Sequence, residues 1–239
     1  MEPLSFDIEI SDVFDLKEHE DLAAYAPFHI SVAATALYQG EERIWFSTDA
    51  TGKPAMNLTA DHAHELLEYL EAMQARGVMV CAWNGLGFDL RWIGRQAGDP
   101  ALAARIALRS FDPMFQFFNR TGFPVALAKV AAAMGIAQEK LMDGAEAPKR
   151  WRAGRHREVM DYCLGDCQMT NLVVRAIQKA GELRWVTTRG TVRSEPLPRL
   201  LPVEAVLREP GPDQSWMDRP LPKTKFYDWV REALPGALD

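Results

Sequence analysis

The 239-residue chain has few cysteines, no excess of positive charge and no long apolar run. Its three cysteines, Cys81, Cys163 and Cys167, are too few and too scattered for a disulfide framework. Cys163 and Cys167 share a helix face, but two thiols alone rarely hold a metal, so we expect these two to fill a core. No segment approaches the roughly 20 consecutive apolar residues of a membrane helix. The acidic start lacks the pattern of a signal peptide. We therefore expect a cytoplasmic protein that does not use a membrane.

Acidic residues outnumber basic ones, 33 to 27, for a formal charge of −6. This balance argues against a surface that binds nucleic acid everywhere by positive charge, but it does not exclude a local basic track. One such run is "KRWRAGRHR", residues 149–157. An isolated run of this kind is most often a solvated loop leading into a first helical turn.

The hydrophobic pattern predicts strands and helices in alternation. Segments that alternate or are continuously apolar are predicted as strands: residues 4–10, 29–39, 42–48, 78–83 and a short one within 106–113. Segments with the helical period are predicted as helices: residues 58–77, 84–98, 123–136 and 154–181. The strand at 78–83 is apolar enough to be a central one. Together they predict an α/β fold with a mixed central sheet flanked by helices.

The composition changes after Gly181 to prolines, arginines and tryptophans. We therefore divide the chain into a domain over residues 1–181 and a C-terminal part over 182–239 that packs on it. This part begins with a predicted hairpin turning at Arg189 and Gly190. The rest is predicted to be an extended tail, held on the surface by Trp216 and Trp229.

Four acids occupy positions that predict burial. Asp7 and Glu9 are two residues apart on a strand and so share one face, and Asp166 lies within the apolar stripe of the longest helix. Asp89 follows a strand in the first turn of a helix. An unpaired buried carboxylate costs several kcal/mol, so each must be protonated, paired or bound to a metal. With no obvious basic partner in the sequence, the four acids predict divalent cations, Mg²⁺ or Mn²⁺.

Three segments, "FDIE", "WNGLGFD" and "YCLGD", resemble the motifs of the DEDD (DnaQ-like) superfamily of 3′–5′ exonucleases. The motif residues fall on Asp7 and Glu9, on Asn84 and Asp89, and on Tyr162 and Asp166. The tyrosine marks the DEDDy branch, and "YCLGD" is similar to the proofreading domain of family B DNA polymerases. The resemblance covers roughly residues 1–180 and implies an RNase H-like fold. Ile10 departs from the threonine or serine that often follows the glutamate.

The resemblance implies hydrolysis of single-stranded 3′ ends, DNA before RNA, with two metal ions. Asp7 would bridge both ions, Glu9 and Asp166 would complete the one on the nucleophile side, and Asp89 would hold the other. Tyr162 would orient the attacking water, because a phenol with an ordinary pKa near 10 is a poor base at neutral pH. The plainer alternative for Tyr162 is core packing.

Further residues are predicted to contact the substrate. They are Asn84, Leu86, Phe88, Lys149, Arg150, Trp151 and Arg155. Leu86 would wedge the terminal base, Phe88 or Trp151 would stack on a base, and the basic run would follow the phosphates. Asn84 is equally well explained as a turn residue. We interpret Asp112 as a helix cap or turn residue, and His156 as a phosphate contact or a surface residue.

Three other functions remain open at this stage. An exoribonuclease of the same superfamily would use the same acids on RNA. A catalytically inactive RNase H-like module that binds nucleic acid or protein would have little reason to keep four repelling carboxylates. A hydrolase for a small phosphoester would need a closed pocket in place of a groove. The sequence identifies no protein partner.

Overall fold

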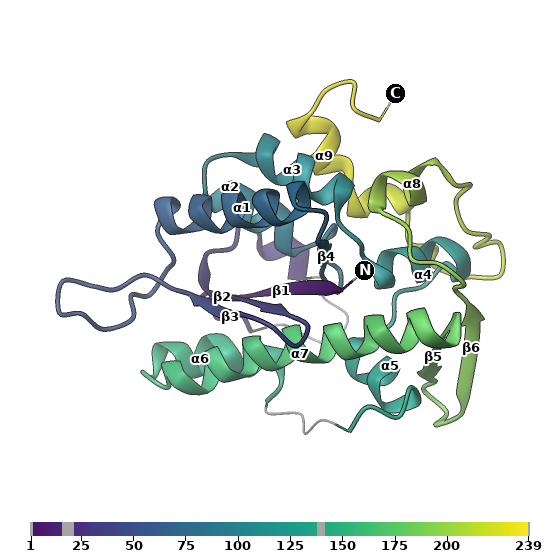
Figure 1. Cartoon of the computed structure of the whole chain (residues 1–239), viewed down its shortest axis with the longest axis horizontal. Coiled ribbons are helices and arrows are strands. Elements are labelled where there is room, and N and C mark those ends of the chain that lie inside the picture. The colour runs from purple at the N-terminus through teal and green to yellow at the C-terminus, as the bar shows by residue number, and fades with distance from the viewer. Residues whose placement is uncertain (1, 16–21, 138–141, 239) are drawn as a thin grey trace.

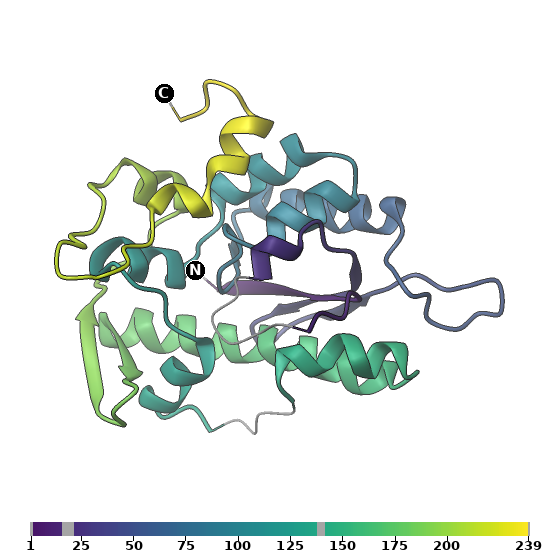
Figure 2. The ribbon, with the colours of Figure 1, turned by 180° about the vertical axis from the view of Figure 1, so that it is seen from behind.

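A computed structural model describes residues 2–15, 22–137 and 142–238 of the chain. It shows a mixed α/β fold in which a central sheet lies between two layers of helices (Figures 1 and 2). The sheet consists of β1 (Pro3–Ile10), β2 (Ile30–Leu37), β3 (Glu42–Trp45) and β4 (Met79–Cys81), in the order β3-β2-β1-β4. β2 runs antiparallel to both β1 and β3, whereas β4 is parallel to β1. The prediction of a mixed sheet flanked by helices is confirmed.

The helices divide between the two faces of the sheet (Figure 1). Above the sheet in that view lie α1 (Ala60–Ala75), α2 (Asp89–Gln96), α3 (Pro100–Arg109), α8 (Val203–Arg208) and α9 (Asp228–Ala233). Below it lie α5 (Leu127–Ala133), α6 (Ala147–Arg152) and α7 (His156–Ala180). The remaining helical elements are α4 (Pro113–Thr121), η1 (Leu22–Tyr25), η2 (Gly144–Glu146) and η3 (Lys223–Phe226). Within the described ranges, no helix combines the length and the apolar character needed to cross a bilayer.

β1 presents a different chemistry to each layer. Leu4, Phe6 and Ile8 belong to the buried cluster shared with α1 and α2. The alternate residues face α7, where the Ser5 hydroxyl donates to Asn171 Oδ1 at 2.8 Å. Because successive strand residues point to opposite faces, Asp7 follows Ser5 onto the α7 side.

One edge of β1 is open over its second half. β1 pairs with β2 along its length, but with β4 only from Pro3 to Ser5. A buried backbone N–H beyond that point needs another acceptor. The Asp89 carboxylate supplies it, accepting the N–H of Ile8 at 3.2 Å. An acid from α2 therefore stands where a neighbouring strand would continue.

α7 follows the predicted pattern. It ends at Gly181, whose φ of 69° is the left-handed conformation that favours glycine. Cys163 and Cys167, one turn apart, are buried against Ala34 and Ala36 of β2. The prediction that these two cysteines fill the core is confirmed.

Two predictions about strands are wrong. The first half of the segment predicted as a strand within 106–113 belongs to α3, and Phe111 forms only an isolated bridge to Cys81. The reason lies in the Asp-Pro pairs at 99–100 and 112–113, which start α3 and α4 and leave room for no strand between them. β4 is the last strand in the sheet order rather than a central one, but Phe111 covers its free edge.

The C-terminal part begins with the predicted hairpin, β5 (Glu182–Val186) and β6 (Val192–Pro196). The prediction of an extended tail is wrong, since the segment contains α8, η3 and α9. Its apolar residues share the main core with β1: Val203, Val206, Phe226, Trp229 and Val230. Trp229 is buried and holds the tail as expected. Trp216 is 62% exposed, and its ring contacts that of Phe123 edge-on, with the two centroids 6.2 Å apart.

Candidate metal centre

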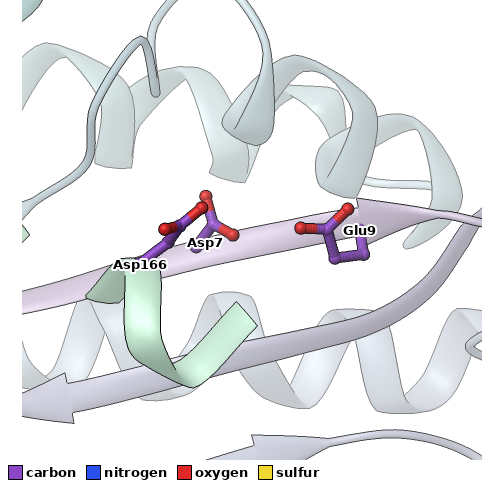
Figure 3. Close-up of side chains that lie close together, drawn as sticks. All are labelled: Asp7, Glu9 and Asp166. Carbon is purple, nitrogen blue, oxygen red and sulfur yellow. The ribbon is translucent and has the colours of Figure 1, made fainter. Parts of the chain in front are cut away.

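Three carboxylates meet between β1 and α7. One oxygen from each of Asp7, Glu9 and Asp166 lies within 4.8 Å of the others. Figure 3 shows Asp7 and Glu9 on one strand and Asp166 beside Asp7 on the neighbouring helix. β1 and α7 are far apart in sequence, and their packing brings the first and third motifs together. Three of the four acids that the sequence predicts for a metal site therefore lie together.

Asp89 approaches from the other layer of the fold. It is the first residue of α2, is 3% exposed and reaches β1 between Asp7 and Glu9 through its bond to the Ile8 N–H. Burial, followed by the charges of Asp112 and Asp166, raises its pKa to about 7. Asp89 is thus close enough to the cluster for its charge to affect Asp7, although it is not one of the three that meet within 4.8 Å.

The acids of the cluster raise one another's pKa values. For Asp7, burial is the largest cause, followed by the charges of Asp89, Glu9 and Asp166. For Glu9, burial again comes first, followed by Asp166 and Asp89. Such a group is stable only when it is protonated or when a cation neutralises it. Hard carboxylate oxygens are the ligands that Mg²⁺ and Mn²⁺ prefer, so the donor set fits these ions.

Tyr162 lies one helical turn before Asp166 and is partly buried beside it. Burial, then the charges of Asp166, Glu9 and Asp7, raises the pKa of its hydroxyl. The phenol therefore stays protonated at neutral pH and can donate a hydrogen bond, but it cannot serve as a base. Its ring packs against a small buried cluster that includes Met142 and Val159. Core packing and a role at the site are both compatible with this position.

Asp112 organises the turn that precedes Asp89. Its carboxylate accepts the N–H of Asn84 at 3.2 Å and that of Leu86 at 3.1 Å, and it caps α4 through the N–H of Phe115 at 2.9 Å. Burial raises its pKa to about 6. The predicted cap is confirmed, and its second role, bracing the turn, was not expected from the sequence. The only signal was an Asp-Pro pair, which marks a cap and says nothing about a distant turn.

Two residues predicted to contact substrate are buried. Leu86 is 1% exposed within the main core, and its carbonyl accepts the Trp229 indole N–H at 2.8 Å. Trp151 is 1% exposed, and its indole N–H is shared between the carbonyls of Ala55 and Met56, each at 3.1 Å. Neither side chain can wedge or stack on a base, because both fill the interior. Phe88 remains partly exposed beside a pocket.

The basic run is largely paired with acids of its own segment. Lys149 lies 3.1 Å from Glu146, while Arg150 and Arg155 both contact Glu158. Contact between these three cations and phosphate stays a prediction. Arg152, which was not among the predicted substrate contacts, donates instead to the carbonyl of Ser11 at 2.9 Å, directly after the end of β1.

No protein-family model matches the chain, and a search of the curated proteins finds no match either. The donor atoms themselves show what the site can do. Three carboxylate oxygens at this spacing could hold a metal ion. Tyr162 stands beside this cluster as a hydrogen-bond donor.

Proposed function

We propose that the protein is a metal-dependent 3′–5′ exonuclease of the DEDDy type with an RNase H-like fold. The observation that carries the proposal is the convergence of Asp7, Glu9 and Asp166, whose ligand oxygens lie within 4.8 Å. They come from two of the three motifs that resemble this superfamily, and Asp89, from the remaining one, bonds to the same strand. Chance motifs would have no reason to meet at one place in the fold.

The residues have distinct roles in the proposed reaction. Asp7, Glu9 and Asp166 would hold the ions, and Asp89 would complete the set from the α2 side. When bound, Mg²⁺ or Mn²⁺ would lower the pKa of a water molecule that it holds and would stabilise negative charge on the phosphate. Tyr162, protonated and beside Asp166, would orient the attacking water by donating or accepting one hydrogen bond. The products are a nucleoside 5′-monophosphate and a strand shorter by one nucleotide.

The deciding experiment uses 5′-labelled single-stranded DNA and RNA of the same sequence, with Mg²⁺, Mn²⁺ or EDTA. We expect a ladder that shortens from the 3′ end with either ion and no reaction in EDTA. DNA is the expected substrate, given the likeness to proofreading domains. Faster trimming of RNA would instead identify the exoribonuclease.

Two aspartates of α7 provide a matched pair of variants. Asp166→Asn should abolish the ladder, because it removes a metal ligand. Asp161→Asn, on the exposed side of the same helix where Asp161 pairs with Arg157, should leave the rate unchanged within about twofold. Intact oligonucleotides with the unmodified protein, under conditions where binding is still detected, would favour the inactive binding module over any exonuclease.

A further inference from the structure

The hairpin of β5 and β6 lies in a segment with a local excess of positive charge. Residues 175–199, from the last turns of α7 to just beyond β6, contain six basic and two acidic residues, a formal charge of +4. The rest of the chain carries −10, because the whole has −6. The six basic residues are Arg175, Lys179, Arg184, Arg189, Arg193 and Arg199. Positive charge is therefore concentrated at this end of the fold (Figure 1).

Both acids of this segment are already paired. Glu182 contacts Arg184 on the same strand, and Glu195 lies 3.2 Å from an arginine of α4. Arg189 and Arg193 are exposed, and no ion pair involves either of them within the described part of the chain. Their charge is open to an anionic partner.

An aromatic surface adjoins these arginines. Residues directly opposite each other in an antiparallel pair share a face, so Arg193 lies beside Trp185. The ring of Phe123 links Trp185 to Trp216, with centroid distances of 6.0 and 6.2 Å. Trp185 and Phe123 are partly buried, but Trp216 is 62% exposed. Trp216 therefore presents ring surface that a planar ligand can reach.

Hydrogen bonds hold Trp216 in this position. Its indole N–H donates to the Asp213 carbonyl at 3.1 Å, and the Asp213 carboxylate accepts the Ser215 N–H at 2.9 Å. The Gln214 side chain donates to the carbonyl of Gly122 at 2.7 Å, which ties this loop to the end of α4. A side chain that is already fixed loses less conformational entropy when a ligand covers it.

Positive charge beside an exposed ring matches the chemistry of single-stranded nucleic acid. Its phosphates attract arginine, and its unpaired bases have flat faces that stack on tryptophan. A duplex offers the charge, but its bases are stacked inside the helix. The carboxylates of an acidic protein would match the arginines alone. Single-stranded nucleic acid is the partner that uses both features.

We propose that Arg189, Arg193 and Trp216 form a second contact for single-stranded nucleic acid, the hairpin surface, separate from the metal centre. On α7, Asp166 and Gly181 are 15 residues apart, which is about 22 Å along the helix axis. At about 3.4 Å per nucleotide, a strand spans this distance with roughly six or seven nucleotides. That the strand reaches from one site to the other rests on the proposed exonuclease function. Binding at the hairpin surface needs neither metal nor hydrolysis.

The test measures binding of a fluorescent oligothymidylate of about 20 nucleotides, long enough to cover both sites. The full-length Asp7→Asn protein is titrated in EDTA and about 0.15 M salt, and fluorescence anisotropy reports binding. Arg189→Glu/Arg193→Glu should weaken binding at least about tenfold, because two phosphate contacts become repulsive. Trp216→Ala should weaken it at least about fivefold, the lower range for one stacked base.

A matched control changes the same charge in the other helical layer. Arg105→Glu/Arg231→Glu, on α3 and α9, should alter the affinity no more than about twofold, because charges far beyond a Debye length are screened. Equal weakening by the control and the hairpin variant would refute the proposal, as would unchanged affinity in the hairpin variants. Competition by polyglutamate as effective as by unlabelled oligothymidylate would overturn it in favour of an acidic protein partner.

The exonuclease assay separates the hairpin surface from the proposed function. In an active enzyme, Arg189→Glu/Arg193→Glu should slow the trimming of the long oligonucleotide below saturation. It should leave the trimming of a trinucleotide unchanged, because a trinucleotide is too short to reach the hairpin surface. Equal slowing of both would place the effect at the metal centre and refute the second contact. If the unmodified protein trims neither, binding that depends on the hairpin would uphold the surface and refute the exonuclease.

Discussion

Asp7 is buried among three other acids, an arrangement that destabilises the folded state when the acids are ionised. Its pKa is raised first by burial and then by Asp89, Glu9 and Asp166, so each ionised neighbour destabilises the others. Local conflicts of this kind are expected at functional sites, where a ligand resolves them. The cluster should therefore affect the free energy of unfolding as well as the activity.

The ionisation of Asp89 predicts a pH dependence of stability. Its pKa of about 7 in the folded chain lies above the ordinary 3.8, so the folded state binds more protons between these values. The free energy of unfolding must then fall as pH rises through this range. From pH 6 to pH 8 this group should remove about 1 kcal/mol of stability, or roughly 2–4 °C in Tm.

Thermal unfolding in EDTA at the two pH values measures this effect. Asp89→Asn should lose that part of the pH dependence while remaining folded. Mg²⁺ or Mn²⁺ should raise the Tm of the unmodified protein more at pH 8 than at pH 6, because ionised carboxylates bind cations better. An unchanged pH profile in Asp89→Asn would show that Asp89 is not the titrating group.

Tyr162 predicts a separation of metal binding from turnover. Tyr162→Phe keeps the ring in its cluster but removes the hydroxyl beside Asp166. We expect the stabilisation by Mn²⁺ to persist and the exonuclease rate to fall about 100-fold, the order of loss for a mispositioned reactant. Full activity of the variant would assign the side chain to packing alone.

At the scale of elements, the site depends on how α2 is joined to β4. The turn between them is held in place by a residue outside it. Asp112, at the start of α4, accepts two of its backbone N–H groups. Because Asp89 follows this turn directly, the position of a proposed metal ligand depends on a helix cap more than 20 residues away.

Asp112 and Asp99 form a natural comparison, since each caps a helix just before a proline. Asp99→Ala should cost about 1 kcal/mol, as for an ordinary cap. Asp112→Ala should cost roughly 2–4 kcal/mol, because it also leaves the N–H groups of Asn84 and Leu86 without their acceptor. Urea denaturation of both variants measures the difference, and equal costs would mean that the turn does not need Asp112.

For the molecule as a whole, the C-terminal part is an integral piece of the core and of the candidate site. Trp229 belongs to the cluster that contains β1, and its indole bonds to the carbonyl of Leu86 in the turn before Asp89. Lys225 and Phe226 of the same segment line a pocket together with Asn84 and Phe88 of that turn. Loss of the tail would therefore affect the core and the turn that precedes Asp89 together.

A pair of tryptophans tests this integration. Trp229→Ala should destabilise the protein by about 3–5 kcal/mol, the usual cost of removing a buried aromatic side chain. Trp216→Ala should change stability by no more than about 0.5 kcal/mol, because Trp216 is 62% exposed. Chemical denaturation compares them. A Trp229→Ala protein as stable as the Trp216→Ala protein would mean that the tail is only loosely attached.

The sequence alone was enough to predict the mixed α/β class, the helix ending at Gly181 and the shared face of Asp7 and Glu9. These follow from local rules, since strand and helix periods determine which side chains share a face. That Asp166 would lie near Asp7 and Glu9 was expected from the resemblance of the three motifs, and the packing of α7 on β1 brings it there. The burial of Leu86 and Trp151, the second role of Asp112 and the helices of the tail were decided only by tertiary packing. Each depends on contacts with residues distant along the chain, and a local pattern carries no information about which distant surface will cover it.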